Sequence, residues 1–363
     1  MIILISFIAY TAYFVYSEAQ SVSKQTFTVL RQNTQSIASA IDGELQQMNM
    51  VSMNVSYSNL VKDTFYNYLS GKRAQDTIST FENAKMLGEL LTSILGPNRP
   101  VDQVNLFALD QGVVASGLSN EVRDDRPQDQ LWFESLQSGE HRKTVFYTGE
   151  DPHLSQYYTD PDGKRFISYV RQYYDVFSNP QGYVEIQISV RKLLASAIAT
   201  ESLYGESIIV LDQNGEPMWP RSTDWQAALL HLRESGYPTD FQEFATGGKS
   251  TPMFSLCVPS TESSLMTILL IRRSDLFAPV SQYLQGILLP VLLTLVFALV
   301  LAFFAAKHIT HPISDLFREV RGYELGQNLK AKQPKTNIIE IAALHDGFLH
   351  MQSKMEVSMQ KQL

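Results

Sequence analysis

Residues 277–313 have the sequence FAPVSQYLQGILLPVLLTLVFALVLAFFAAKHITHPI, and the organisation of the chain follows from them. No charged residue occurs between positions 277 and 306. A helix needs about 20 consecutive apolar residues to cross the hydrocarbon core of a bilayer, and residues 288–306 alone supply nearly that length. The sequence therefore predicts a transmembrane helix over residues 279–306, with the preceding and following parts of the chain on opposite sides of a membrane.

The first 17 residues are also uncharged and mostly apolar. They lack the basic segment and the small-residue cleavage site of a secretory signal peptide. We therefore expect a first transmembrane helix over residues 1–17; an uncleaved signal anchor is the alternative and is physically equivalent. Lys307, Arg318 and Arg321 follow the second hydrophobic segment, and positive charge beside a span favours the cytoplasmic side. This predicts an extracellular location for residues 18–275 and a cytoplasmic C-terminal part.

The composition argues against several classes of protein. The net charge of the 363 residues is −8, and no basic patch indicates a nucleic-acid partner. Cys257 is the only cysteine, so the chain has no internal disulfide, and we interpret this thiol as a small buried apolar group. No group of His, Cys, Asp or Glu residues has the spacing of a metal site, and we predict no cofactor.

The region 18–275 begins with a helical pattern. Apolar residues recur at steps of three and four and predict one long helix over residues 18–56. The residues of this pattern are Phe27, Leu30, Thr34, Ile37, Ile41, Leu45 and Met48. Asp76 is a good N-cap, and Gly96-Pro97 ends a helix, so a second helix is predicted between them.

Strand patterns then predict two successive units of similar plan. The first, at about residues 76–189, has a hairpin at 104–115, a short helix at 131–136 and strands at 144–147, 165–174 and 183–188. The second, at about residues 205–271, has a hairpin at 207–219, a helix at 224–234 and strands at 253–258 and 265–271. Asp110 and Asp212 stand in the two hairpin turns, and we interpret both as turn residues and not as metal ligands. The predicted fold class is α+β.

Two amphipathic segments follow residue 306. Ile309, Ile313, Leu316, Val320 and Tyr323 are spaced 4, 3, 4 and 3, and Ile341, Leu344, Phe348, Met351 and Met355 are spaced 3, 4, 3 and 4. Both are the spacings of coiled-coil seams. Two short helices cannot bury such seams alone, whereas two chains together form a parallel four-helix bundle. The pattern predicts a homodimer, with coverage by other helices as the alternative.

In this order, the parts of the chain resemble the double Cache receptors of bacteria. The resemblance implies a tandem PAS-like sensor domain over residues 18–275, between two membrane spans in the bacterial cell membrane. His311-Pro312-Ile313 resembles the start of a HAMP linker, which implies such a linker over residues 307–358. Glu340 stands where the family has the Glu of its Asp-Glu-x-Gly motif, although the Asp and Gly are absent here. The resemblance implies a signalling role for Pro312, Ile313, Leu316, Val320, Glu340, Leu344, Phe348 and Met351.

The combination is most similar to the N-terminal sensor half of a sensor histidine kinase of Gram-positive bacteria. The chain has no phosphoacceptor histidine motif and no ATP-binding motif, so we predict no catalytic residue in it and expect residues 359–363 to begin the helix of a missing output domain. A response regulator would be a partner only through that missing kinase region. The alternatives are the input half of a chemoreceptor, of a cyclic-dinucleotide synthase or of a membrane-tethered transcription regulator, and a stand-alone binding protein.

Aromatic residues with a few polar neighbours suit a pocket for a small polar ligand. Six residues of the first unit lie on elements that we expect to line one cavity: Arg126, Trp132, Tyr147, Tyr169, Tyr173 and Asp175. The alternative is that the aromatic residues belong to the core and that Arg126 is solvated. Members of the family that bind amino acids carry Arg-x-Trp-Tyr; here Arg126 stands six residues before Trp132-Phe133, so the resemblance does not imply amino-acid binding. An extracellular protein partner is the other expected type of ligand.

Overall fold

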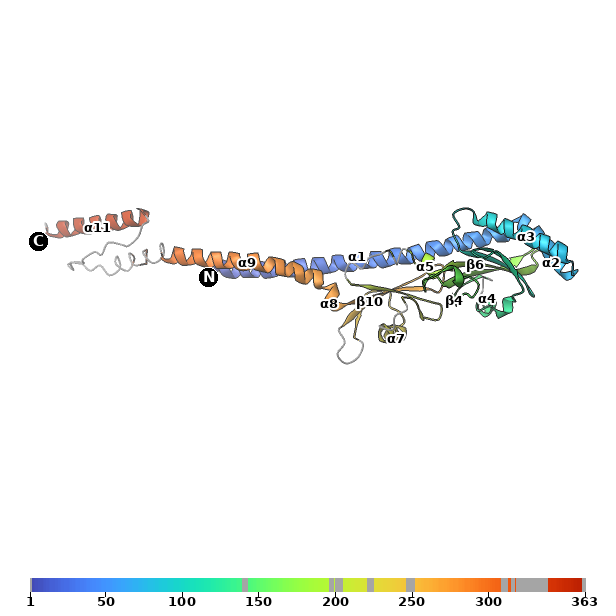
Figure 1. Cartoon of the computed structure of the whole chain (residues 1–363). Coiled ribbons are helices and arrows are strands. Elements are labelled where there is room, and N and C mark those ends of the chain that lie inside the picture. The colour runs from blue at the N-terminus through green and yellow to red at the C-terminus, as the bar shows by residue number, and fades with distance from the viewer. Residues whose placement is uncertain are drawn as a thin grey trace. The chain divides into compact units, whose positions relative to one another are not determined.

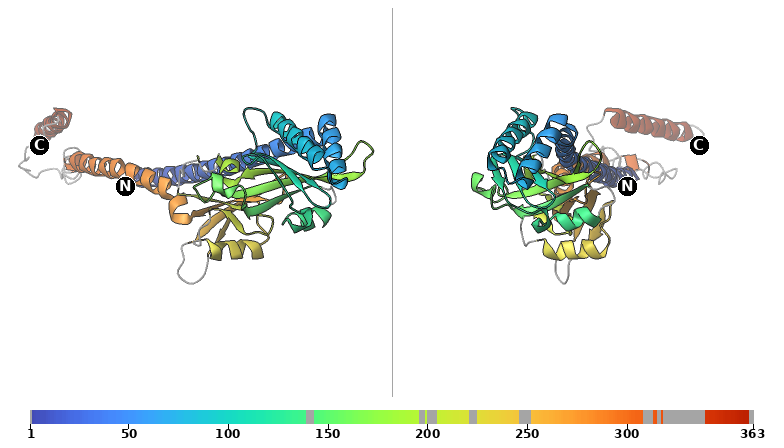
Figure 2. Two further views of the ribbon diagram at one scale, coloured as in Figure 1. Left: turned by 45° about the vertical axis from the view of Figure 1, so that its right-hand side comes forward. Right: turned by 90° about the vertical axis from the view of Figure 1, so that its right-hand side faces the viewer.

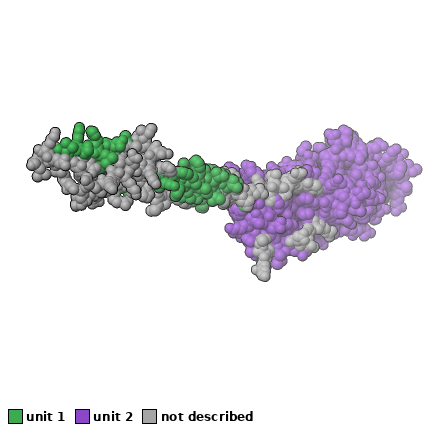
Figure 3. Space-filling model, turned by 60° about the vertical axis from the view of Figure 1, so that its left-hand side comes forward, with its two compact units in different colours: residues 1–19, 280–363 green, residues 20–279 purple. Residues whose placement is uncertain are grey.

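The computed structural model describes residues 2–138, 143–195, 199, 205–220, 225–245, 252–307, 313, 314, 317 and 339–360. The chain divides into two compact units, which Figure 3 distinguishes by colour. One unit is Gln20–Pro279, and the other combines Met1–Ala19 with Val280–Leu363. Within the described ranges, no helix combines the length and the apolar composition that a membrane crossing needs.

Three helices open the chain. The first, α1 (Ile2–Tyr57), includes the predicted long helix and ends one residue after its predicted end. The second, α2 (Asn59–Arg73), was not predicted; it begins after Ser58, whose side chain accepts a hydrogen bond from the backbone N–H of Val61. The third, α3 (Thr77–Leu95), begins after Asp76 and ends at Gly96, as predicted. Asp76 accepts hydrogen bonds from the first turn of α3, which is the ordinary role of an N-cap.

The first of the two predicted units, which we call the distal unit, contains a six-stranded antiparallel sheet in the order β3-β2-β1-β6-β5-β4. Two of its strands, β4 and β6, are labelled in Figure 1. Its strands are β1 (Gln103–Ala108), β2 (Val113–Gly117), β3 (Glu121–Arg123), β4 (Lys143–Glu150), β5 (Arg165–Tyr174) and β6 (Pro180–Ser189). Three short helices lie in its connections: η1 (Pro127–Asp129), α4 (Phe133–Ser138) and η2 (Ser155–Tyr157). The strands β1–β2–β3 and β4–β5–β6 thus form two meanders that join through the β1–β6 pair, with β3 and β4 at opposite edges of the sheet.

Both faces of the distal sheet are covered. Helices α1, α2 and α3 pack on one face, and α4 lies on the opposite side (Figure 2). Val184, Ile186 and Ile188 of β6 belong to the core under the helices. Because successive residues of a strand point to opposite faces, Tyr183, Glu185 and Gln187 lie on the other face, and they are buried as well.

The second predicted unit, the proximal unit, follows α5 (Val190–Leu193) and has a five-stranded sheet in the order β8-β7-β11-β10-β9. Its elements are β7 (Ser207–Leu211), β8 (Pro217–Trp219), α7 (Gln226–Glu234), β9 (Gln242–Phe244), β10 (Met253–Pro259) and β11 (Met266–Arg272). Helix α7 packs on one face of this sheet, and a second cluster joins Leu30 of α1 to Ile271 of β11 and to Leu276 of α8 (Arg273–Leu276). The start of the C-terminal helices is thus packed against α1 and the proximal sheet.

Two further helices follow, α9 (Ala278–Ala305) and α11 (Ile339–Gln360). Helix α11 includes the second amphipathic segment, Ile341 to Met355. Leu344 and Met351 of this segment are exposed. Ile313 is exposed too, whereas Pro312, Leu316 and Val320 lie outside the described residues.

A buried arginine joins the distal and proximal sheets. Arg165, at the start of β5, is 4% exposed and donates a 2.7 Å hydrogen bond to the carbonyl of Met218 in β8. It also donates to the hydroxyl of Tyr147 at 3.3 Å and pairs with Asp162. The amide of Gln213 adds a second link, since it accepts a hydrogen bond from the backbone N–H of Tyr147 at 3.0 Å. The distal and proximal units are therefore held together by hydrogen bonds of defined geometry.

We predict that Arg165→Met lowers the free energy of unfolding by about 3 kcal/mol, because it leaves a buried carbonyl and a carboxylate without their donor. The measurement is chemical denaturation of the full chain, followed by tryptophan fluorescence. The control is Arg191→Met, which removes an exposed ion pair with Asp160 that is worth at most about 1 kcal/mol. An equal, small effect of both substitutions would show that Arg165 does not join the units.

Candidate functional site

Polar side chains line the face of the distal sheet that lies opposite the helices. Five of them, on the central strands β1, β5 and β6, are at most 2% exposed: Gln103, Asn105, Ser168, Glu185 and Gln187. Segments of the β2–β5 connections cover them, since Ser119 and Asp151 hydrogen-bond to this set and Trp132 packs beside it. The strands therefore carry a polar surface that is closed off from solvent by the loops.

Glu185 is the centre of this polar network. One carboxylate oxygen accepts a hydrogen bond from the Ser168 hydroxyl at 2.5 Å, and the other accepts from the Asn105 amide at 2.9 Å. The Asn105 amide also donates to the Gln187 side-chain oxygen at 2.8 Å. Gln187 in turn donates to Asp151 at 3.1 Å, which connects the sheet to the covering loop.

Burial raises the pKa of Glu185 above its usual value of 4.5, because the charged form loses its hydration. The hydrogen bonds from Ser168 and Asn105 oppose this shift, while the negative charge of Asp151 adds to it. Among the described residues, no basic side chain forms an ion pair with Glu185. Arg123 is nearby but pairs with Glu121 and Asp125. The positive charge of Arg123 also opposes the rise in the pKa of Glu185, so the site has a buried acid that feels a nearby cation but forms no ion pair among the described residues.

An aromatic wall adjoins the polar network. Trp132 is fully buried, and its ring centroid lies 5.6 Å from those of both Phe107 and Tyr183. Strands β1 and β6 pair Phe107 with Tyr183 and Asn105 with Glu185. The aromatic wall therefore lies on the same face of the sheet as Glu185, two residues along each strand. The buried indole N–H of Trp132 has no hydrogen-bond acceptor among the residues that the structure describes. Leaving a buried donor unpaired costs about 1–3 kcal/mol, which an acceptor group that reached it would recover.

The expectation that the predicted aromatic residues line a single cavity is wrong. Trp132 lies on the loop face, whereas Tyr169 and Tyr173 lie on the helix face because they alternate with Ser168 and Val170 along β5. Tyr169 donates a hydrogen bond to Asn49 of α1 at 2.9 Å, and Tyr173 packs edge-to-face on Phe65. Both are core residues, the alternative interpretation that the sequence left open.

The other predicted residues lie at the edges of the unit. Tyr147 packs against the helix-side core and contacts Arg165 at the junction of the sheets. Arg126 is exposed and precedes η1. Asp175 follows β5 and accepts hydrogen bonds of 2.8 Å from the backbone N–H groups of Phe177 and Asn179. These contacts make Asp175 a turn residue. Asp212 has the same function, as predicted, because it accepts from Asn214 and Glu216.

Sequence reasoning missed Glu185 and its neighbours. The available signals were Asn105 within the apolar strand Val104–Phe107 and the alternation of Glu185 and Gln187 with isoleucines. Alternation normally indicates a strand with one face in solvent. Only the long-range packing of residues 118–138 and 143–154 shows that this second face is buried.

No protein-family model matches the chain, and no curated protein matches its sequence. Among solved structures, the ligand-binding domain of the Campylobacter jejuni chemoreceptor Tlp3, in complex with 4-methylisoleucine, matches with a TM-score of 0.50 and 14% identity over 70% of this chain and 94% of that domain. The extracellular domain of vpHK1S-Z8, a protein named as a histidine kinase, matches with a TM-score of 0.48 and 11% identity over 72% of this chain and 96% of that one.

A third match is a domain of a protein from Vibrio parahaemolyticus named as a sensory box/GGDEF family protein, with a TM-score of 0.47 and 12% identity over 70% of this chain and 99% of that one. The match to Tlp3 shows the fold: over 70% of its length this chain has the mixed helix-and-sheet fold of that ligand-binding domain. The α+β fold class is therefore confirmed.

We predict that Glu185→Gln changes how stability depends on pH. The pKa of Glu185 is raised in the folded state, so protonated Glu185 adds to the free energy of unfolding. This contribution is complete below pH 4.5 and is lost as the pH rises through the folded-state pKa. The thermal midpoint of the variant, relative to that of the wild type, should therefore rise with pH above 4.5. Thermal unfolding at several pH values measures this difference. Glu150→Gln, on the exposed end of β4, is the control for the same chemical change. A difference that does not vary with pH would contradict the assignment.

Proposed function

We propose that the chain is a membrane receptor whose distal unit binds a small molecule carrying an amine or another cationic hydrogen-bond donor. One observation supports this most directly: the acid Glu185 is buried and forms no ion pair with any described residue, two residues along the same strand face from the aromatic wall of Trp132. A ligand ammonium group would pair with this acid, and charge-assisted hydrogen bonds are among the strongest that a site offers. Trp132 would contribute an apolar surface together with its unpaired N–H.

The covalent connections of the fold provide a route for the signal. Strand β6, which carries Glu185, continues into α5 and the proximal unit. Strand β5 begins at Arg165, which donates to Met218 of the proximal sheet. Strand β11 of that sheet continues into α8 and α9. Ligand binding that favours one of two packings of the distal unit would therefore bias the position of the C-terminal helices.

The sequence supports the rest of the proposal. Residues 277–306 are uncharged, as are residues 1–17, and we propose them as two spans of a bacterial cell membrane in contact with lipid. We propose residues 18–275 as the double Cache sensor and residues 307–358 as a HAMP linker that forms a homodimer. Pro312, Ile313, Leu316, Val320, Glu340, Leu344, Phe348 and Met351 would transmit the signal. The output that we propose is a two-component histidine kinase of a Gram-positive bacterium.

The test is a thermal-shift screen of the full chain in detergent against amines, carboxylic acids and sugars. We expect amines to raise the thermal midpoint of the wild type and of Glu150→Gln. In Glu185→Gln the affinity for the same amine should fall by about tenfold or more, since a charge-assisted hydrogen bond is lost. Trp132→Phe preserves the aromatic packing and should weaken binding less. Full affinity in Glu185→Gln, or stabilisation by acids and sugars alone, would overturn the proposed site.

A further inference from the structure

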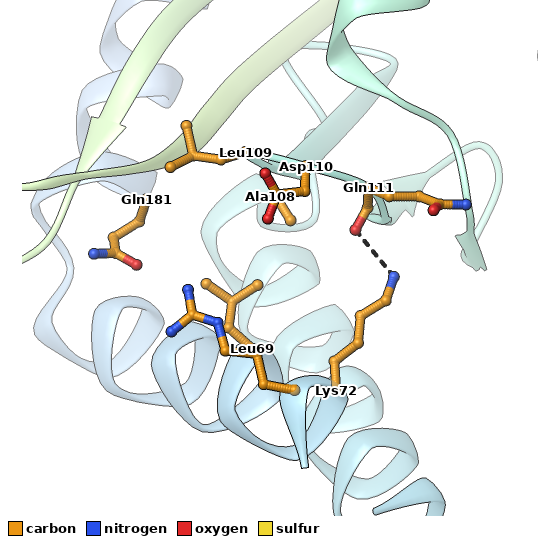
Figure 4. A pocket seen from close by; sticks show the side chains of 8 residues that line it. Leu69, Lys72, Ala108, Leu109, Asp110, Gln111 and Gln181 are labelled. Carbon is orange, nitrogen blue, oxygen red and sulfur yellow. Dashed lines mark hydrogen bonds between the residues drawn. The ribbon is translucent and has the colours of Figure 1, made fainter. Parts of the chain in front are cut away.

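A cavity lies at the end of the distal sheet, away from Glu185. It has a volume of about 190 Å³ and lies between the C-terminal end of α2, the β1–β2 turn and the start of β6 (Figure 4). Its lining residues are Leu69, Lys72, Arg73, Ala108, Leu109, Asp110, Gln111 and Gln181. None of these residues hydrogen-bonds to the Glu185 network, so the two sites are separate.

The rim of this cavity has a defined structure. Lys72 donates a hydrogen bond to the carbonyl of Gln111 at 3.0 Å, drawn in Figure 4, and pairs with Asp124 at 3.1 Å. Gly112 has a φ of +111°, and a Cβ there would stand 2.5 Å from the Lys72 ammonium. The turn at Asp110 is therefore fixed on α2 in a conformation that requires glycine.

Two opposite charges line the cavity without partners. Arg73 and Asp110 each form no hydrogen bond or ion pair with any residue that the structure describes, although both line the same cavity. The Asp110 carboxylate is turned toward the cavity in Figure 4. The amide nitrogen of Gln181 is held by Asp175 at 3.2 Å, so the Gln181 oxygen is left as an acceptor. The cavity thus offers a guanidinium donor and separate acceptors for a cation.

These groups define the ligand by its chemistry. A guanidinium matches a carboxylate, and a carboxylate with an amide oxygen matches an ammonium group. Leu69 and Leu109 provide apolar contact between them. The volume is below the about 300–1,000 Å³ of pockets that hold drug-sized ligands. We propose that this cavity binds a small zwitterion, with its carboxylate on Arg73 and its ammonium group on Asp110 and Gln181. The proposal does not depend on the function assigned to Glu185.

The test is isothermal titration of the full chain with glycine, β-alanine and γ-aminobutyrate, which differ in the separation of their charges. Acetate and methylamine carry one charge each and serve as probes of the separate halves. We expect at least one zwitterion to bind. In Glu185→Gln, which lacks the proposed amine site, we expect acetate and methylamine each to bind at least about tenfold more weakly than that zwitterion. Arg73→Gln and Asp110→Asn should each reduce the affinity for the zwitterion about tenfold. Both residues are exposed, so both variants should keep the wild-type thermal midpoint.

Glu185→Gln separates this inference from the proposed function, because it should leave zwitterion binding at the cavity unchanged. Arg191→Gln is the control for the loss of an exposed arginine elsewhere in the distal unit. Three results would overturn the inference: acetate that binds as well as the zwitterions, binding that Glu185→Gln abolishes while Arg73→Gln does not, or no binding by any of the three zwitterions at millimolar concentration.

Discussion

Strand β6 pairs with β1 and β5 and is covered on both faces, and the rest of the distal unit depends on this constraint. Its apolar side chains face α1, α2 and α3, where they form the core. Its polar side chains cannot reach solvent on the other face, so each needs a hydrogen-bond partner within the protein. Asn105 and Ser168, on the two neighbouring strands, supply those partners for Glu185. The sheet is in this way organised around a buried acid.

A buried acid is poor evidence for stability. Removing a carboxylate from water costs several kcal/mol, and hydrogen bonds from two neutral side chains recover only part of that cost. An apolar side chain at position 185 would avoid this cost. In the function that we propose, the ammonium group of a ligand would pair with this acid. The raised pKa of Glu185 is in line with that proposal, because it shows that the nearby charge of Arg123 does not offset the effect of burial.

The connections beyond the distal sheet show how such a site could act at a distance. Arg165 stands three residues before Ser168 on β5 and contacts β8 of the proximal sheet. Leu30 of α1, Ile271 of β11 and Leu276 of α8 share one cluster. Every link in this series is a packed or hydrogen-bonded contact within residues 20–279. In the proposed function, these contacts are the route by which a change at β5 or β6 would reach the start of the C-terminal helices.

Local sequence patterns predicted the helices and hairpins well. The periodicity of α1, the N-cap Asp76 and the two turns at Asp110 and Asp212 are determined by neighbouring residues, and the structure confirms them.

Helix α2 was missed because α1 and α2 are separated only by Ser58, without a proline or glycine. Glu185 was missed because alternation distinguishes two faces without showing whether the second is covered. Trp132 was placed correctly in the distal unit, but its supposed neighbours Tyr169 and Tyr173 point to the other face. Burial of that kind depends on contacts distant in sequence, which no local pattern contains.

The most direct measurement is a structure of the full chain bound to an amine that raises its thermal midpoint. The account predicts that the ligand nitrogen lies within hydrogen-bond distance of the Glu185 carboxylate, on the loop face of the distal sheet beside Trp132. A ligand bound elsewhere, with Glu185 still bonded only to Ser168 and Asn105, would contradict it.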